Sequence, residues 1–172
     1  MTDSFRRGWR AIKTAAVVFA ADQLCKSCVE NKLPVGTRLP LRGDPDGTGR
    51  ADIVLQHVKN RGFALNRLDR HPRLIKVVSG AVSAAMTAAF AESVIRGGDD
   101  PLYQTGLALV TGGGLSNTAD RLLKGEVTDY LTFQRKHGRN KREVVYNAAD
   151  LAIFAGSAIM LFAQLKRRGE RK

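Results

Sequence analysis

The sequence predicts an all-α membrane protein: a bundle of four transmembrane helices with a small extracytoplasmic β element. Three observations lead to this prediction: four apolar segments near membrane-spanning length, small residues at helix-packing spacing, and basic chain ends. We expect a single membrane-embedded domain over residues 1–172, because this length suffices for one core and no internal repeat or low-complexity tract divides it.

Each apolar segment approaches the roughly 20 residues that a helix needs to cross a bilayer. The first runs straight into Asp22 and Lys26 without a small-x-small cleavage site, so we expect it to be retained rather than removed as a signal peptide. GxxxA and AxxxA spacings in the second and fourth segments favour close helix packing. The mean hydropathy of −0.20 is low for a membrane protein and leaves a soluble helical bundle as the alternative. The predicted spans are about residues 11–30, 74–95, 101–123 and 148–166.

Four spans place both chain ends on one side of the membrane. The N-terminal RRGWRAIK and the C-terminal KRRGERK are strongly basic, which is typical of cytoplasmic ends. The connections over residues 31–73 and 124–147 then face outward, although the basic run at 135–142 is contrary to that tendency. In the first connection DPDGTG predicts a turn and ADIVLQHVKN predicts a strand. We therefore expect a small sheet at the outer end of the bundle.

The formal net charge is +12, with 28 Lys and Arg against 16 Asp and Glu, which suits an anionic surface. We favour a membrane surface over nucleic acid, because aromatic residues are sparse and no nucleic-acid-binding motif is present. A soluble basic helical protein that binds nucleic acid is the less favoured alternative.

Cysteine and histidine do not indicate a metal site. Cys25 and Cys28 form a CxxC, but no second Cys or His pair has metal-ligand spacing, and we expect both thiols to be buried on one helix face. His57, His71 and His137 show neither metal nor triad spacing, which predicts surface or interface positions. We therefore expect neither a metal nor another cofactor.

Two carboxylates, Asp129 and Asp150, lie beside apolar segments near the predicted outer interface. Two carboxylates brought close cannot both ionise easily, so one is protonated while the other stays charged. Aspartic proteases use this arrangement: one carboxylate activates a water and its protonated partner polarises the carbonyl. The structural alternative makes Asp129 a turn residue and Asp150 a helix N-cap, and spacing does not exclude it.

Further polar residues lie in the predicted spans. Ionisable groups within membrane segments are costly and usually face the bundle interior. We expect Asn117, Asp120 and Arg121 to meet the two acids at one level near the outer interface, with Asp22 apart from them. Asp22 and Lys26 are four residues apart on a helix, which predicts an ion pair inside the bundle.

Five blocks, in order along the chain, resemble the lipoprotein signal peptidases, or signal peptidase II, which are aspartic proteases of the bacterial inner membrane. The blocks cover most of the chain from residue 21 to residue 150. Ser116, Tyr130 and Tyr146 depart from the family pattern, as does NRGFAL in place of the usual Ala-Ala-Phe, and these departures affect pocket shape rather than the acids. The blocks are ADQLCK with Asp22 and Lys26, NRGFAL with Asn60 and Gly62, GGGLSNTADR with Gly113, Asn117, Asp120 and Arg121, GEVTDY with Asp129, and YNAAD with Asn147, Ala149 and Asp150.

The resemblance implies an endopeptidase that cuts a diacylglyceryl-modified prolipoprotein just before its lipidated cysteine. Asp129 and Asp150 would be the catalytic pair, without metal. The enzyme would be a monomer surrounded by membrane lipids. Asn117, Arg121 and Asn147 would orient the pair or bind substrate carbonyls, with helix-to-helix hydrogen bonding as the alternative. Asn60 and Gly62 would position a loop against the substrate. A relative that binds lipidated peptides without cutting them is the alternative function.

Overall fold

The computed structural model describes residues 3–42, 53–62, 72–97, 100–133 and 144–170. Helices dominate this part of the chain, and four short strands form one antiparallel sheet in the order β1-β2-β3-β4. The elements are α1 (Asp3–Lys32), β1 (Arg38–Arg42), β2 (Ile53–Asn60), α2 (Pro72–Arg96), α3 (Pro101–Leu123), β3 (Val127–Phe133), β4 (Val145–Tyr146) and α4 (Ala148–Gly169).

Local sequence explains the helix ends. Asp100 caps α3 by accepting a hydrogen bond from the Leu102 amide, and a proline follows it at the first helical position. Gly125, with a φ of 84°, turns the chain from the end of α3 into β3. Asn147 caps α4 in a reciprocal capping box with Asp150.

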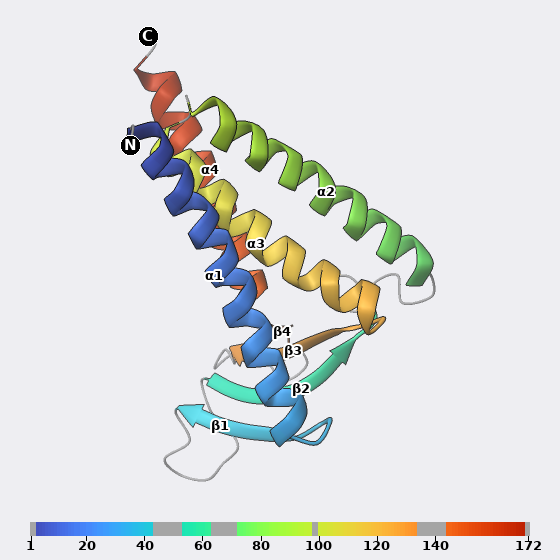
Figure 1. The fold of residues 1–172 in the computed structure, drawn as a ribbon. Coiled ribbons are helices and arrows are strands. Elements are labelled where there is room, and N and C mark those ends of the chain that lie inside the picture. The colour runs from blue at the N-terminus through green and yellow to red at the C-terminus, as the bar shows by residue number, and fades with distance from the viewer. Residues whose placement is uncertain (1–2, 43–52, 63–71, 98–99, 134–143, 171–172) are drawn as a thin grey trace.

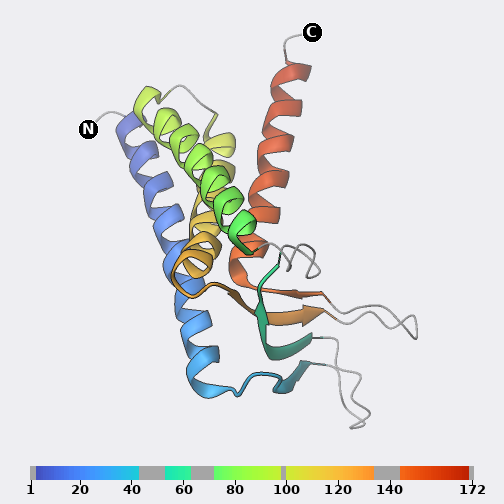
Figure 2. The same ribbon diagram turned by 90° about the vertical axis from the view of Figure 1, so that its right-hand side faces the viewer.

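The helices form a bundle, and the sheet lies across one of its ends. Both chain termini lie at the opposite end, as the two views show (Figures 1 and 2). Helix α3 is central and packs against α1, α2 and α4. The apolar core, made by Ala11, Ala15, Phe90, Leu107 and Ala108, lies in the part of the bundle away from the sheet.

Glycines allow α3 to approach its neighbours closely. A Cβ on Gly113 would lie 2.5 Å from the Ala149 carbonyl oxygen of α4, and one on Gly112 would lie 2.5 Å from the Ala15 carbonyl oxygen of α1. Gly106 and Gly156 meet in the same way farther along α3 and α4. Such small-residue contacts are typical of membrane helix pairs.

Replacing Gly113 with alanine is expected to push the start of α4 away from α3 and to lower the melting temperature. Overpacking of this kind costs about 1–3 kcal/mol. Gly114→Ala is the matched control, because its Cβ would meet only the Ser83 hydroxyl, at an ordinary 3.5 Å. In a helix the alanine itself is favourable by about 1 kcal/mol. Equal melting temperatures for the two variants in the same detergent would contradict this account of the packing.

Within the described residues, two helices have the length and composition to cross a membrane: Arg73–Arg96 and Ala148–Gly169, each with an 18-residue window of mean hydropathy 1.7. Only 22% and 17% of their most apolar windows are buried inside the protein. The core helix of a soluble protein would be mostly buried, so these exposed faces disfavour the soluble bundle. Their exposed apolar side chains include Val77, Val82, Ile95, Phe154, Leu161 and Phe162.

The predicted elements correspond to the observed ones with two differences. Helix α1 begins at Asp3, well before the predicted start at about residue 11. The predicted strand 51–60 is present as β2, but the other three strands of the sheet, β1, β4 and β3, which carries Asp129, were not predicted. The turn at DPDGTG and the basic run at 135–142 lie outside the described residues.

Candidate active site

Asn147 organises the region where α3, α4 and the sheet meet. Its side-chain amide is completely buried and donates to Asp129 Oδ1 at 2.7 Å and to Asn117 Oδ1 at 3.1 Å. Its side-chain oxygen accepts a hydrogen bond from the Asp150 backbone amide at 2.9 Å. One residue therefore caps α4 and touches both predicted catalytic residues.

Asp129 lies on β3 and is almost completely buried. Its Oδ1 accepts the Asn147 bond, and its Oδ2 accepts a hydrogen bond from Asn60 Nδ2 at 2.9 Å. The Asn60 oxygen in turn accepts from the Gly62 amide at 3.0 Å, which orients the Asn60 side chain. Both oxygens of Asp129 are thus held by neutral donors.

Asp150 lies in the first turn of α4 and is held in a similar way. Asn117 Nδ2 donates to its Oδ1 at 2.8 Å, and the Asn147 backbone amide donates to its Oδ2 at 3.3 Å. Asp150 is not the N-cap of α4, as the structural alternative had proposed, but the third helical residue, which completes the capping box of Asn147. Because Asn117 and Asn147 are also bonded to each other, the two carboxylates share one amide framework.

Burial raises the pKa of the Asp129 carboxyl from 3.8 to about 6, and the nearby charge of Asp150 adds to this effect. The hydrogen bonds from Asn60 and Asn147 and the charge of Lys26 oppose it. Between these two pH values the folded protein binds more protons at this site than the unfolded chain. The contribution of the Asp129 carboxyl to the free energy of unfolding therefore falls as the pH rises from about 3.8 to about 6.

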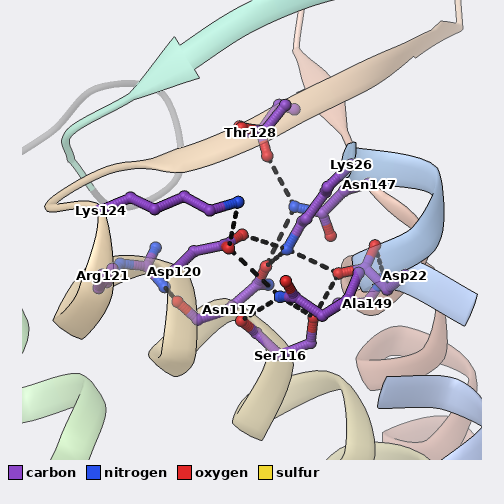
Figure 3. Close-up of polar contacts among 12 residues, drawn as sticks. Asp22, Lys26, Ser116, Asn117, Asp120, Arg121, Lys124, Thr128, Asn147 and Ala149 are labelled. Atoms are coloured by element: carbon purple, nitrogen blue, oxygen red, sulfur yellow. Dashed lines mark hydrogen bonds and ion pairs between the residues drawn. The ribbon is translucent and has the colours of Figure 1, made fainter. Parts of the chain in front are cut away.

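A buried ion network around Lys26 contacts the amide framework at Asn117 (Figure 3). The Lys26 ammonium lies 2.6 Å from Asp22, 2.8 Å from Asp120 and 2.8 Å from Asn117 Oδ1. All three of its donors are thus matched by acceptors. The ion pair of Asp22 with Lys26 was predicted, but the second carboxylate, Asp120, was not assigned to it. Asp120 bonds Lys26, Lys124 and Gln23 rather than joining the two catalytic candidates.

Asp22 does not stand apart, as the sequence had predicted, but reaches the start of α4. Its Oδ1 accepts from the Ala149 backbone amide at 3.1 Å and from the Tyr130 hydroxyl at 3.2 Å. Its Oδ2 accepts from the Ser116 hydroxyl at 2.6 Å. The prediction failed because it considered depth in the membrane alone, whereas α1 crosses close to the start of α4.

Three contributing residues were missed: Gln23, Ser116 and Tyr130. Gln23 donates to the Ser116 hydroxyl at 2.9 Å, and Tyr130 accepts from the Ala148 amide at 3.0 Å while it bonds Asp22. The signal for Gln23 and Ser116 was present, because uncharged polar residues in an apolar span need partners. The signal for Tyr130 was its place beside Asp129, where an added hydroxyl distinguishes it from the family pattern.

Arg121 and Gly62 lie beside the carboxylates. The Arg121 guanidinium donates to the Asn117 carbonyl at 3.3 Å and to the Gly62 carbonyl at 3.4 Å. It therefore joins α3 to the segment after β2. Gly113 contacts α4 at Ala149, next to Asp150. Every residue predicted for the site lies in this region or in its supporting network.

Two predictions about cysteine and histidine were wrong. Cys25 and Cys28 are both exposed rather than buried, because the face of α1 that carries them points away from the bundle. His57 is buried, not superficial, since it lies on β2 and bonds the Leu33 carbonyl at 2.7 Å. His71 and His137 lie outside the described residues. In the described part of the chain, no group of three or more His, Cys, Asp or Glu could hold a metal ion.

Comparison with known proteins shows the family to which this chain belongs. A family model described as signal peptidase (SPase) II matches residues 14–166. Similar proteins include a lipoprotein signal peptidase of Azoarcus sp. (strain BH72), 33% identical over 92% of this chain and 83% of the relative. Another is the lipoprotein signal peptidase of Burkholderia vietnamiensis, 31% identical over 95% of this chain and 91% of the relative.

A solved structure of a bacterial membrane enzyme has a similar fold. It superposes with a TM-score of 0.74 at 22% identity, over 95% of this chain and 92% of the other. A second structure described in the same way gives a TM-score of 0.70 at 22% identity, over 91% and 93% of the two chains.

Proposed function

Because this chain belongs to the signal peptidase II family, we propose that it is an aspartic endopeptidase of the bacterial inner membrane. Its substrate is a diacylglyceryl-modified prolipoprotein, which it cuts just before the lipidated cysteine. The observation that carries the proposal is the sharing of Asn147 by Asp129 and Asp150. That arrangement places two acids on one amide framework, where burial raises the pKa of one of them.

The reaction needs one ionised and one protonated carboxyl group. The ionised carboxylate takes a proton from a water molecule as the water oxygen attacks the scissile carbonyl carbon. The protonated partner donates its proton to the carbonyl oxygen, which gives a tetrahedral species with two hydroxyl groups. The first acid then passes its proton to the amide nitrogen as the carbon–nitrogen bond breaks, and the second acid takes a proton back from one hydroxyl as the new carboxyl group forms. Asn117 and Asn147 hold one oxygen each of Asp150 and Asp129 throughout. This chemistry is the same whichever of the two acids carries the proton first.

The position of the site suits a substrate that lies in a membrane. Asp129 lies on β3 and Asp150 in the first turn of α4. These elements lie where the bundle meets the sheet, and both chain ends lie at the other end (Figure 1). If all four helices cross the membrane, the basic chain ends lie on the cytoplasmic side. The site then lies near the outer face. The apolar outer faces of α2 and α4 then contact lipid, and the site is reached from within the membrane.

Substrate contacts are assigned to the residues next to the acids. The Asn60 and Gly62 segment borders Asp129, and Arg121 is attached to it through the Gly62 carbonyl. Donor groups of Asn60, Gly62 and Arg121 bond the backbone carbonyls of an extended peptide. These bonds hold the scissile bond in front of the acids. The supporting residues Asp22, Lys26, Asp120 and Gly113 act through the framework and do not touch the peptide.

Cleavage of a lipidated precursor is the direct test of this function. We expect purified protein in detergent to release the signal peptide from a diacylglyceryl-modified precursor and not from the same precursor without the lipid. The lipid supplies binding and orientation at the level of the bilayer. Binding of the lipidated precursor without any release would instead support the non-catalytic alternative.

Replacing Asn60 with alanine is expected to move the pH dependence of kcat/KM. The Asn60 amide stabilises the ionised form of Asp129, so its loss raises the pKa of that carboxyl above its value of about 6. A hydrogen bond to a charged group is worth about 1.5–3 kcal/mol, so the inflection should move up by about one to two pH units. Asn31→Ala is the control, since exposed Asn31 bonds only Ser27 in the described structure. An unmoved or lowered inflection in Asn60→Ala would contradict the assignment to Asp129.

A further inference from the structure

A second polar cluster lies beside the active site, at the end of α1. Glu30 Oε1 accepts from Lys59 Nζ at 2.8 Å and from Lys124 Nζ at 3.1 Å. The buried Thr128 hydroxyl donates to the same oxygen and accepts from Lys59 at 3.0 Å. One carboxylate therefore joins α1, β2, β3 and the residue at which α3 ends. None of these four residues was recognised in the sequence.

The sheet register places this cluster back to back with Asp129. Lys59 on β2 lies directly opposite Thr128 on β3. Since side chains alternate along a strand, the following residues, Asn60 and Asp129, project from the other face of the same two strands. There Asn60 donates to Asp129 at 2.9 Å. The cluster thus holds together the two strand segments that bring Asn60 to Asp129.

A second connection leads from the cluster toward Asp150. Lys124 lies 3.1 Å from Asp120 Oδ1 (Figure 3). It also bonds Glu30. The other oxygen of Asp120 lies 2.8 Å from Lys26, which holds Asn117, the donor to Asp150. The cluster is therefore continuous with the network behind each catalytic carboxylate.

We propose that Glu30 is a positioning residue for the reaction: its carboxylate fixes β3 and the end of α3 against α1, and so sets where Asp129 stands relative to Asp150. The inference rests on the proposed function. It concerns a residue that touches neither acid and acts through Thr128 and Lys124.

The charges show what the loss of Glu30 would do. Its single negative charge lies between two ammonium groups. With glutamine in its place, Lys59 has no acid partner here and is one-quarter exposed, so we expect it to turn toward water. Lys124 keeps Asp120. Thr128 then loses Lys59 as a donor and keeps only a neutral amide oxygen as its acceptor, so β3 is held less firmly to α1 on the face opposite Asp129.

Kinetics of Glu30→Gln, Thr128→Val and the double variant test the inference. We expect each single change to lower kcat about tenfold with KM nearly unchanged, since small misplacements of catalytic groups are costly. The double variant should be no slower than the slower single variant, because both changes break the same interaction. Thr128→Ser, which keeps the hydroxyl, should restore most of kcat. A wild-type kcat in Glu30→Gln, or single effects that multiply in the double variant, would overturn the inference.

Glu126→Gln is the matched control, because Glu126 also pairs across the sheet but with Arg61, which is 76% exposed. The Arg61 Nε lies 3.1 Å from the Glu126 carboxylate, and the pair contacts neither Thr128 nor Lys124 in the described structure. We expect this variant to keep the wild-type kcat. An equal fall in both glutamate variants would mean that general loss of charge, not positioning, lowers the rate.

A direct titration of Asp129 by carbon NMR in detergent gives a readout that needs no cleavage. Removing a negative charge alone would lower the pKa of a nearby carboxyl, because a like charge disfavours ionisation. Displacing β3 would weaken the hydrogen bond from Asn60 to Asp129, and this would raise the pKa of the Asp129 carboxyl. We expect the midpoint to rise in Glu30→Gln and to stay unchanged in Glu126→Gln. A fall, or no change, would overturn the inference.

The two readouts separate the possible failures. If wild-type protein never cuts the lipidated precursor but the midpoint rises in Glu30→Gln, the proposed function fails and the positioning of Asp129 stands. If wild type cuts and Glu30→Gln matches it in kcat and midpoint, only the inference fails.

Discussion

Asparagine at position 129 or 150 is expected to abolish signal-peptide release while the protein remains folded and in the membrane fraction. An amide has the size of a carboxylate but can neither take a proton from water nor deliver one to the carbonyl. General acid–base catalysis contributes about 10²–10⁴-fold, so each variant should lose at least about 100-fold in kcat/KM. The double variant should be no slower than the slower single one, because the two acids act as a unit.

These changes should lower the free energy of unfolding only modestly, too little to explain the loss of activity. Asp129 accepts from Asn147 on one oxygen and from Asn60 on the other, and an asparagine there offers a single acceptor oxygen. One donor then faces an NH₂ group, which costs about 1–3 kcal/mol. Melting temperature and signal-peptide release should be measured on the same preparation in detergent. Activity within tenfold of wild type in either variant would remove that residue from the catalytic pair.

Lys26→Met is expected to destabilise the protein more than any other single change considered. Methionine fills a similar volume, but it leaves Asp22 and Asp120 buried without their shared cation. Breaking a buried ion pair by removing one partner costs about 3–5 kcal/mol. Asn117 also loses a donor at its side-chain oxygen, so the support of Asp150 weakens. We expect a large fall in melting temperature together with a loss of cleavage.

Glu92→Gln is the control for Lys26→Met. The Glu92 carboxylate lies 3.1 Å from Arg96, but both side chains are more than half exposed to the outside of the protein. Exposed pairs contribute little, so we expect no measurable change in melting temperature. Adding Asp22→Asn to Lys26→Met should recover part of the loss, because one uncompensated charge is removed. A Lys26→Met protein as stable as wild type would show that Lys26, Asp22 and Asp120 do not form a buried network of charges.

The helices were predictable because the signals that form them are local. Helix α3 runs over residues 101–123 as predicted, since Pro101 begins it and the glycine at 125 follows its end. Helices α2 and α4 differ from their predicted spans by only a few residues at their ends. The extra length of α1 at its N-terminus was missed because the basic residues there were taken as a segment outside the span.

Strand β3 was not predictable in the same way. Its residues Val127–Phe133 are mostly buried on both faces, so they lack the alternation that marks a half-buried strand. Its partner β2 lies about 70 residues earlier in the chain, and the pairing of Val58 with Asp129 depends on that contact. Local sequence places Asp129 just after a turn, and only the sheet makes it part of a rigid strand.

Local sequence predicted the helices of this protein, its basic ends, and the acids and amides that resemble signal peptidase II. Short-range caps, apolar runs and motif spacing are sufficient for these features. The hydrogen bonds and ion pairs between these side chains became known only from the tertiary structure. It showed Asn147 between Asp129 and Asp150, Asp120 joined to Lys26, and Glu30 behind Thr128. These contacts join residues up to 98 positions apart, and their geometry follows from how the helices and strands pack rather than from any local pattern.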